Sequence, residues 1–228
     1  MIATIHPWNV QRFMEYRGRL PGEWHLVLSP KDLTAARVAA IKPRYLFFPH
    51  WSWKVPREVF EQTESILFHM TDLPYGRGGS PLQNLIVRGH QETVISAVRM
   101  TEELDAGPIY MKRPLDLGGS ALEIFERASS IIFEMIEEIV QTNPVPLEQQ
   151  GTPTYFKRRT PDMSRLPENI SSLEQLYDHI RMLDAPGYPQ AFLDQKNYRI
   201  EFSKTTLKDG QLEAKARISM KDHDGEDE

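Results

Sequence analysis

The sequence predicts an α/β fold with a mostly parallel sheet, followed by a small C-terminal α+β subdomain that ends in a β-hairpin. Over residues 1–141, short apolar runs alternate with segments of helical apolar spacing. This alternation is typical of a parallel sheet covered by helices on both faces. Near the C-terminus, two alternating segments flank Asp209-Gly210, a frequent hairpin turn. The 228 residues suffice for one good-sized domain with an appendage.

Caps and helix breakers delimit the elements in the first part of the chain. A Leu-Pro-Gly break at residues 20–22 ends one helix, Ser29 is placed to cap the next, and Pro43 stops it. Pro56 begins a third helix, at a position where the missing N–H of proline costs nothing. The compact apolar run at residues 44–48 is typical of a buried strand. The predicted strands cover residues 2–5, 24–28 and 44–48, and the predicted helices cover residues 11–19, 32–41 and 56–63.

The same pattern continues through the middle of the chain. A short apolar run ends at His69 and leads into a glycine-rich loop. Ser120 is placed to cap a long helix whose apolar residues, from Leu122 to Ile139, recur at helical spacing. The predicted strands cover residues 65–68, 93–100 and 109–113, and the predicted helices cover residues 79–88 and 121–141.

Proline-rich sequence separates this core from the C-terminal part. Five prolines interrupt residues 142–170, which favours an extended connector. Beyond it, Ser171 or Ser172 caps a helix at residues 172–183, and strands at residues 198–204 and 211–219 pair as a hairpin. We therefore expect a core at residues 1–141, a connector at 142–170, a small subdomain at 171–220, and an acidic, disordered tail at 221–228.

Composition excludes several kinds of site. The chain has no cysteine, which excludes disulfides, a thiolate nucleophile and a thiolate zinc site. The net charge of −5 disfavours a nucleic-acid partner, because such proteins usually carry a basic face. No apolar run reaches the ~18 residues that would suggest a membrane-spanning helix, and the N-terminus lacks a signal-peptide pattern. We expect a cytoplasmic protein with no membrane partner.

His69 and Asp105 are the strongest candidates for chemistry. His69 ends an apolar run before a glycine loop, and Asp105 lies in the loop between the predicted strands at residues 93–100 and 109–113, beside Gly107. Such positions lie at the carboxyl ends of strands, where functional groups gather in parallel sheets. A carboxylate beside an imidazole orients the ring and favours its charged form. The alternative for each residue alone is a structural role, as a loop-capping histidine and an ordinary turn aspartate.

The glycine loop at residues 76–80, Gly-Arg-Gly-Gly-Ser, has two interpretations. It matches neither the P-loop nor the dinucleotide fingerprint. It is either a tight turn that feeds a helix or a place where backbone N–H groups meet an anionic substrate group. In the second case, we expect contacts from Tyr75, Arg77, Gly78, Gly79 and Ser80.

Together these motifs resemble the formyltransferase family, which uses 10-formyltetrahydrofolate. The resemblance is carried by His69, by Leu-Pro-Tyr-Gly-Arg-Gly-Gly-Ser-Pro-Leu-Gln at residues 73–83, and by Leu-Asp-Ala-Gly-Pro-Ile at residues 104–109. It covers residues 44–141 well and is weak over residues 1–43, where His-Pro-Trp-Asn replaces the usual glycine-containing first turn. The resemblance implies a Rossmann-like core, direct formyl transfer to an amine, and no metal.

The resemblance also implies roles for the two candidate residues. His69 would stabilise the developing oxyanion, and Asp105 would handle the proton through a bound water. The family's Asn, two residues before the histidine, is replaced by Leu67, and one such donor contributes about 3–4 kcal/mol. Asn84 is a candidate replacement and a third catalytic residue, with Ser80 and Thr71 as other donors. The remaining hypotheses are catalysis by His69 with backbone N–H groups alone, and an inactive protein.

The family's folate pocket corresponds to residues 48–56, Phe-Pro-His-Trp-Ser-Trp-Lys-Val-Pro. We expect Phe48, His50, Trp51 and Trp53 to contact the pteridine, together with Asp105. The alternative is that one tryptophan is core and the other covers an edge. A different acyl donor also stays possible, because the first turn and this loop are unusual.

The C-terminal part resembles the tail of sugar-nucleotide formyltransferases. This similarity predicts a UDP- or dTDP-linked amino sugar as acceptor, in surface-glycan or flagellin-glycan biosynthesis, with Arg158 and Arg181 near its diphosphate. The alternatives are other acceptors, namely methionyl-tRNA or glycinamide ribonucleotide, and an inactive protein that binds folate or nucleotide sugar. A homodimer is a further expectation from the family.

Overall fold

The structure is a computed structural model in which residues 1–221 are described. Two compact units interleave along the chain. The first comprises Met1–Pro81, Glu92–Asp116 and Phe125–Lys157, and the second comprises Leu82–Gln91, Leu117–Ile124 and the chain from Arg158 onward. The expected boundaries at residues 141 and 170 stay predictions, and residues 222–228 of the expected tail lie outside the described residues.

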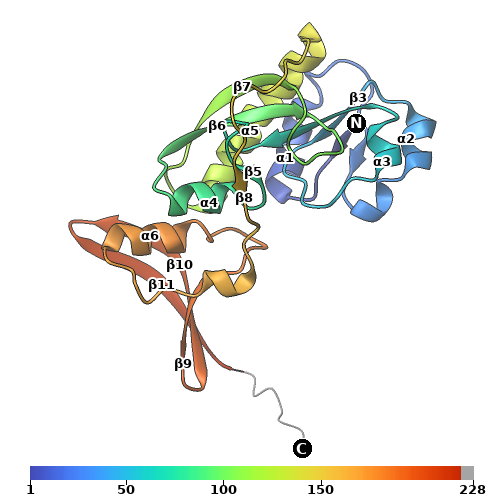
Figure 1. Cartoon of the computed structure of the whole chain (residues 1–228). Coiled ribbons are helices and arrows are strands. Elements are labelled where there is room, and N and C mark those ends of the chain that lie inside the picture. Colours follow the sequence, from blue (N-terminus) through green and yellow to red (C-terminus); the bar gives the residue numbers. More distant parts are fainter. Residues whose placement is uncertain (222–228) are drawn as a thin grey trace, which may run out of the picture. The chain divides into compact units, whose positions relative to one another are not determined.

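A six-stranded sheet forms the centre of the first unit (Figure 1). Its spatial order is β2-β1-β3-β4-β6-β7, and the first four strands are parallel. The last two run antiparallel, to their neighbours and to each other. The strands are β1 (Ile2–Ala3), β2 (Leu26–Val27), β3 (Tyr45–Phe48), β4 (Glu64–His69), β6 (Glu92–Arg99) and β7 (Ile109–Asp116). The predicted α/β class with a mostly parallel sheet is confirmed.

The two faces of this sheet bury alternate residues of the same strand. Leu46 and Phe48 of β3 join a hydrophobic cluster with Val38 and Val59, which belong to α2 (Ala35–Ile41) and α3 (Arg57–Phe60). Phe47 stacks instead on Phe68 of β4, on the opposite face. Because successive side chains of a strand point to opposite faces, an all-apolar strand such as β3 must be covered on both sides.

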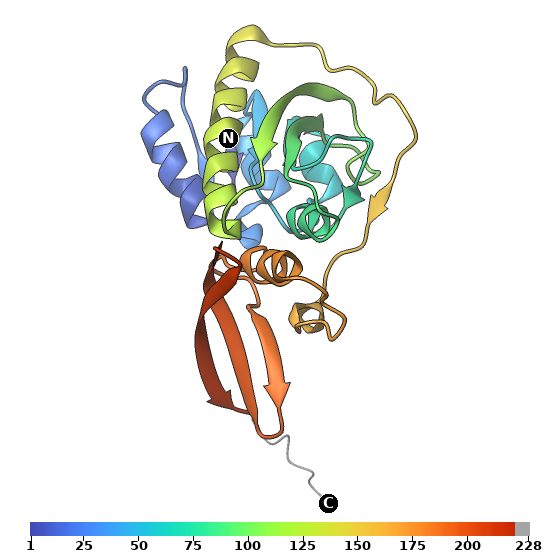
Figure 2. The same ribbon diagram turned by 90° about the vertical axis from the view of Figure 1, so that its left-hand side faces the viewer.

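A second pair of helices packs together in the first unit (Figure 2). α1 (Pro7–Tyr16) stacks Trp8 on Phe125 and places Tyr16 against Phe133 of α5 (Ala121–Thr142). α1 begins four residues earlier than predicted, because Pro7 occupies the first helical position, where its missing N–H is harmless. Ser120 and Glu123 exchange hydrogen bonds at the start of α5, as a capping pair does.

The proline-rich segment that was predicted as a connector pairs with the glycine loop. β8 (Tyr155–Phe156) lies parallel to β5 (Arg77–Gly78) in a two-stranded sheet. Leu147 forms an isolated bridge to Ile109 at the start of β7. Two short 3₁₀ turns, η1 (Pro30–Asp32) and η2 (Pro161–Ser164), complete the irregular parts. Backbone hydrogen bonds at Leu147, Thr154 and Phe156 tie parts of this segment to the core.

The second unit contains a three-stranded antiparallel sheet of order β11-β10-β9, with α6 packed against it. Its elements are α4 (Pro81–Val87, whose first residue belongs to the first unit), α6 (Leu173–Arg181), β9 (Ala191–Gln195), β10 (Tyr198–Lys208) and β11 (Gln211–Met220). Lys208 pairs with Gln211 across Asp209-Gly210, and both turn residues have positive φ. This is the two-residue hairpin that the sequence predicts; strand β9 was not predicted.

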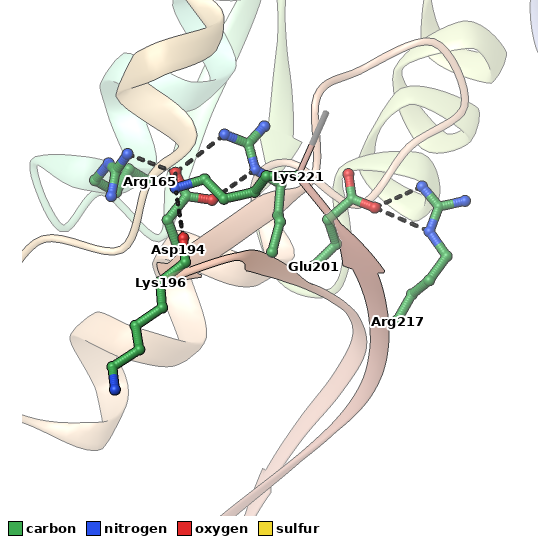
Figure 3. A network of polar contacts seen from close by, with 7 residues as sticks. Arg165, Asp194, Lys196, Glu201, Arg217 and Lys221 are labelled. Atoms are coloured by element: carbon green, nitrogen blue, oxygen red, sulfur yellow. Dashed lines mark hydrogen bonds and ion pairs between the residues drawn. The ribbon is translucent and has the colours of Figure 1, made fainter. Parts of the chain in front are cut away.

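A charged network lies on this small sheet (Figure 3). The Asp194 carboxylate accepts hydrogen bonds from Arg165 at 2.6 Å and from Arg199 at 2.8 Å. The Lys221 ammonium lies 3.9 Å from the same carboxylate. The hydrogen bond from Arg199 holds the pKa of Asp194 below its usual value. Cations therefore outnumber the carboxylate at this point of the sheet. Among residues 1–221, no helix combines the length and the apolarity needed to cross a membrane.

Candidate active site

His69 is the last residue of β4, and its two ring nitrogens face oxygen atoms. Nε2 lies 2.8 Å from the carbonyl oxygen of Gly76, and Nδ1 lies 3.6 Å from Oδ2 of Asp105. A carbonyl oxygen can only accept, so Nε2 must carry the proton of this hydrogen bond. Nδ1 is then the nitrogen that can exchange a proton beside the carboxylate. Both side chains are buried. The 3.6 Å distance shows that the structure brings the two predicted residues together.

Asp105 is held by the loop between β6 and β7 in an unusual backbone conformation. Its φ is 54°, in the left-handed region that few non-glycine residues occupy. Oδ2 accepts a hydrogen bond of 2.9 Å from the backbone N–H of Gly78. Two residues on, a Cβ at Gly107 would lie 1.9 Å from the carbonyl oxygen of Arg99. Only glycine allows this close approach, which explains the Asp-Ala-Gly spacing.

The glycine loop needs glycine for a similar reason. Gly78 has φ +107°, and a Cβ there would lie 2.5 Å from the carbonyl oxygen of Phe156 on β8. The N–H of Gly79 donates to the same carbonyl at 3.1 Å, and Tyr75 packs edge-on against the Phe156 ring. Backbone packing therefore accounts for the glycines, as in the tight-turn interpretation of the sequence. The predicted substrate contacts of Tyr75, Gly78, Gly79 and Ser80 stay predictions.

Arg77 is buried and engaged within the first unit. Its guanidinium donates to Oε1 of Glu103 at 2.9 Å and to Oε1 of Gln149 at 2.8 and 3.2 Å. The predicted contact to an anionic substrate group would have to compete with these acceptors. Sequence reasoning missed Gln149 and also Thr154, whose hydroxyl accepts the N–H of Gly76 at 2.8 Å. The prolines of this segment favour an extended backbone, and this was the signal in the sequence that the segment could lie along another loop.

Leu67, the residue in place of the family's Asn, serves packing. It lies on β4 opposite Phe48 and packs against the hydrophobic cluster of the α2 and α3 face. Thr71, one of the proposed replacement donors, is buried, with its hydroxyl 3.5 Å from the Gly76 carbonyl that His69 also contacts. Asn84 belongs to the second unit, where its Oδ1 accepts a hydrogen bond from Arg88. A catalytic role for Asn84 stays a prediction.

The aromatic loop after β3 lies at the same strand edge as His69. Trp51 and Trp53 meet edge to face at 5.3 Å, and Trp53 is 43% exposed. The Trp51 indole N–H is buried and has no hydrogen-bond partner among the described residues. Phe48 is fully core, so its predicted role in binding can only be indirect. An unsatisfied donor beside an exposed ring fits a heteroaromatic ligand with acceptor atoms on its edge.

His50 lies with the unusual first turn. Its ring centroid is 4.0 Å from that of His6 and 4.5 Å from that of Phe125, and His6 stacks on Trp8. Burial lowers the pKa of His6 to about 4 and the pKa of His50 well below its usual value. Both rings are therefore neutral near pH 7. Among residues 1–221, no group of three or more His, Asp or Glu side chains is arranged to hold a metal ion.

The two predicted arginines of the second unit differ. Arg181 is buried, donating to the carbonyl oxygens of Leu117 and Gly119 and to Asp178. These interior partners argue against its predicted contact with a diphosphate. Arg158 is exposed, and its predicted role was tied to the same acceptor.

Comparisons with known proteins identify the family. A family model, "Methionyl-tRNA formyltransferase, C-terminal domain", matches residues 161–219. A methionyl-tRNA formyltransferase of Mesoplasma florum is 24% identical over 83% of this chain and 63% of its own length. The structure of a methionyl-tRNA formyltransferase from Clostridium thermocellum is 45% identical, with a TM-score of 0.93, and the match covers 96% of this chain and 98% of that chain.

More distant structures share the fold alone. HypX from Aquifex aeolicus in complex with tetrahydrofolic acid has a TM-score of 0.71 at 18% identity, over 92% of this chain and 39% of that chain. Sugar N-formyltransferase structures match at 18% identity or less. This chain spans between half and two thirds of the length of the first curated relatives that it matches.

These findings overturn two predictions, the nucleotide-linked amino sugar as acceptor and the absence of a nucleic-acid partner. The matched relatives are methionyl-tRNA formyltransferases, and the small subdomain that suggested a sugar acceptor is shared between both groups at the level of the fold. The net charge was misleading because it averages over the whole chain. Residues 222–228 contain five acidic residues, which equal the entire net charge of −5, and residues 155–221 carry twelve Lys and Arg against nine Asp and Glu. The chain belongs to the formyltransferase family.

Proposed function

We propose that this protein transfers a formyl group from 10-formyltetrahydrofolate to the amino group of methionyl-tRNA. The observation that carries the proposal is the buried His69–Asp105 pair in a chain 45% identical to a methionyl-tRNA formyltransferase. The identity of the acceptor is inferred from that relative, and the reaction chemistry is inferred from the His69–Asp105 pair.

Trp51 and Trp53 are the residues that would hold the folate. When bound, 10-formyltetrahydrofolate supplies the formyl group. The buried indole N–H of Trp51, which has no acceptor among the described residues, would find one on a pterin edge, and the exposed face of Trp53 would cover part of a planar ring. A known fold relative, HypX, carries tetrahydrofolic acid in its structure, which is consistent with this assignment.

Asp105 and His69 are placed to take up the proton that the acceptor amine releases. An amine nitrogen that bonds to the formyl carbon gains positive charge and must lose a proton. The bond between that carbon and the folate nitrogen would break, and the folate nitrogen would take up a proton as tetrahydrofolate leaves. The Asp105 carboxylate is oriented by the Gly78 N–H, and Nδ1 of His69 lies 3.6 Å from it. Positioned proton transfer of this kind typically contributes 10²–10⁴-fold.

Stabilisation of the oxyanion requires a donor at His69 to become available. Nε2 is committed to the Gly76 carbonyl at 2.8 Å. The Thr71 hydroxyl, 3.5 Å from the same carbonyl, can take over this acceptor if the imidazole N–H turns to the substrate. Because Leu67 offers no hydrogen bond, we assign to Thr71 the role of freeing the His69 N–H, by donating to the Gly76 carbonyl in its place.

The test is a transfer assay with methionyl-tRNA and 10-formyltetrahydrofolate. Mass spectrometry of the amino acid released by mild base is expected to show formylmethionine, with free methionine and another aminoacyl-tRNA as control acceptors. Asp105→Ala is expected to abolish the product. Tetrahydrofolate binding without formylmethionine would contradict the proposal and support an inactive protein, as the Leu67 replacement suggests. Equal formylation of every aminoacyl-tRNA would contradict the methionyl acceptor.

A further inference from the structure

We propose that Gln149 is a positioning residue, which fastens the glycine loop to the Asp105 loop and thereby holds Asp105 beside His69. The inference deepens the proposed function and rests on it for its kinetic part. Gln149 lies in the segment that sequence analysis treated as a connector, 44 residues after Asp105.

The Gln149 side chain uses all of its hydrogen-bonding capacity between the two loops. Oε1 accepts from Arg77, from Nη2 at 2.8 Å and from Nε at 3.2 Å. Nε2 donates to the backbone carbonyl of Asp105 at 2.8 Å and to that of Gly107 at 2.9 Å. A primary amide offers two acceptor sites and two donors, so this side chain is fully satisfied by one residue of the glycine loop and two of the aspartate loop.

Backbone pairing on both sides fixes where Gln149 stands. Leu147 exchanges two backbone hydrogen bonds with Ile109, at 2.7 and 2.9 Å. Thr154 donates to Pro74 at 3.1 Å and accepts from the Arg77 N–H at 2.9 Å. The chain between these two anchors is therefore held against both loops within the first unit. Because the backbone is already fixed there, holding the Gln149 side chain in place costs only its rotamer entropy.

Gln149 contacts Asp105 itself and Arg77, the residue that precedes the Gly78 donor to the Asp105 carboxylate. Gln149 binds the carbonyl of Asp105 itself, whose backbone is in the left-handed region at φ 54°. Arg77 immediately precedes Gly78, whose N–H holds Oδ2 of Asp105. Residues in sparsely populated conformations persist only where the surrounding structure determines them. Gln149 restrains the main chain of Asp105 through its carbonyl, and Gly78 restrains the carboxylate.

Glu103 cannot replace this function. It also accepts from Arg77, but its side chain is 65% exposed, and surface ion pairs of this kind contribute little. It leaves the carbonyls of Asp105 and Gly107 untouched. The adjacent Gln150 provides a matched control, because it is exposed and, among residues 1–221, its side chain donates only to the carbonyl of Glu148 at 3.4 Å.

The experiment compares Gln149→Ala, Gln149→Glu and Gln150→Ala in the full chain. Gln149→Glu keeps an acceptor for Arg77 but removes both donors and places negative charge against two carbonyls. We expect kcat to fall by about tenfold to about 100-fold in both Gln149 variants, with KM for both substrates within twofold. Gln150→Ala is expected to match the wild type. A change in KM at constant kcat would overturn positioning in favour of substrate binding.

Hydrogen exchange gives a readout that needs no activity. Peptides that cover residues 101–108 and 76–80 are expected to exchange faster in Gln149→Ala than in Gln150→Ala, with thermal unfolding showing that each variant is folded. Unchanged exchange in both peptides would overturn the inference even in an active enzyme. If the wild type formed no formylmethionine but Gln149→Ala still exchanged faster than the wild type, the fastening of the loops would be sustained while the proposed function failed.

Discussion

Two groups of histidines at the same edge of the sheet have opposite environments. His69, at the end of β4, places both ring nitrogens near oxygen atoms, the Gly76 carbonyl and the Asp105 carboxylate. His6 and His50 follow β1 and β3 and lie among aromatic rings, with centroids 4.0 Å apart. The Nε2 atom of His6 is buried without a hydrogen-bond partner among the described residues.

The difference separates a histidine that can exchange protons from histidines that serve as neutral rings. Burial in apolar surroundings penalises the imidazolium, which lowers the pKa of His6 to about 4. His69 instead has the Oδ2 atom of the Asp105 carboxylate 3.6 Å from its Nδ1. At this edge, the neighbouring oxygen atoms rather than the residue type distinguish His69, the proposed catalytic histidine, from the other two.

The largest effect is expected from Asp105→Asn. The amide oxygen can still accept the Gly78 N–H, so the loop keeps its hydrogen bond, but the negative charge beside His69 is lost. We expect kcat for formyl transfer to fall by about 100-fold or more. Single-turnover assays would measure it, and thermal unfolding would confirm the fold. A rate within twofold of wild type would remove Asp105 from the chemistry.

The same substitution at two histidines tests the comparison directly. His69→Phe removes both hydrogen-bonding nitrogens and is expected to lower kcat by about 100-fold. His6→Phe keeps a planar ring in the aromatic stack and is expected to retain kcat within about threefold, because Nε2 of His6 has no hydrogen-bond partner in the described part of the chain. If the two variants lost activity equally, the distinction between the two environments would be wrong.

A smaller effect is expected at the aromatic loop. Trp51→Phe removes the buried indole N–H and is expected to weaken tetrahydrofolate binding by about tenfold, the value of one typical hydrogen bond. Calorimetric titration would measure this. Trp24→Phe is the control, since the Trp24 N–H is already bonded to the Pro21 carbonyl. Equal affinities for both variants and the wild type would place the folate elsewhere.

The smallest effect concerns stability against acid. The folded-state pKa of His6 is about 4, and its usual value is 6.5. Because the unfolded chain binds the proton more readily, the contribution of His6 to stability is present above pH 6.5 and is lost as the pH falls from 6.5 towards 4. Urea unfolding at pH 7.5, 6 and 5 should show a shallower decline for His6→Phe than for wild type. Identical declines would mean that His6 titrates normally.

Local patterns predicted most of the elements and the two central residues. The apolar run at β3, the capped helix α5 and the Asp209-Gly210 hairpin follow from spacing and turn chemistry, which act over a few residues. His69 and Asp105 were found because each is followed by a glycine-containing loop, in which Gly76 and Gly107 leave no room for a Cβ. Gln149 was missed because its three partner residues lie 42 to 72 positions away, and no local periodicity reports such contacts.

The sequence by itself determined the fold class, the strand ends that carry His69 and Asp105, and the loss of a donor at Leu67. Those features depend on side-chain type and spacing along one segment. Only the tertiary structure decided that Arg77 and Arg181 face protein acceptors, that His50 joins a neutral aromatic group, and that the proline-rich segment completes the site. Each of these is a pairing between distant segments, and its energy exists only once the sheet has brought those segments together.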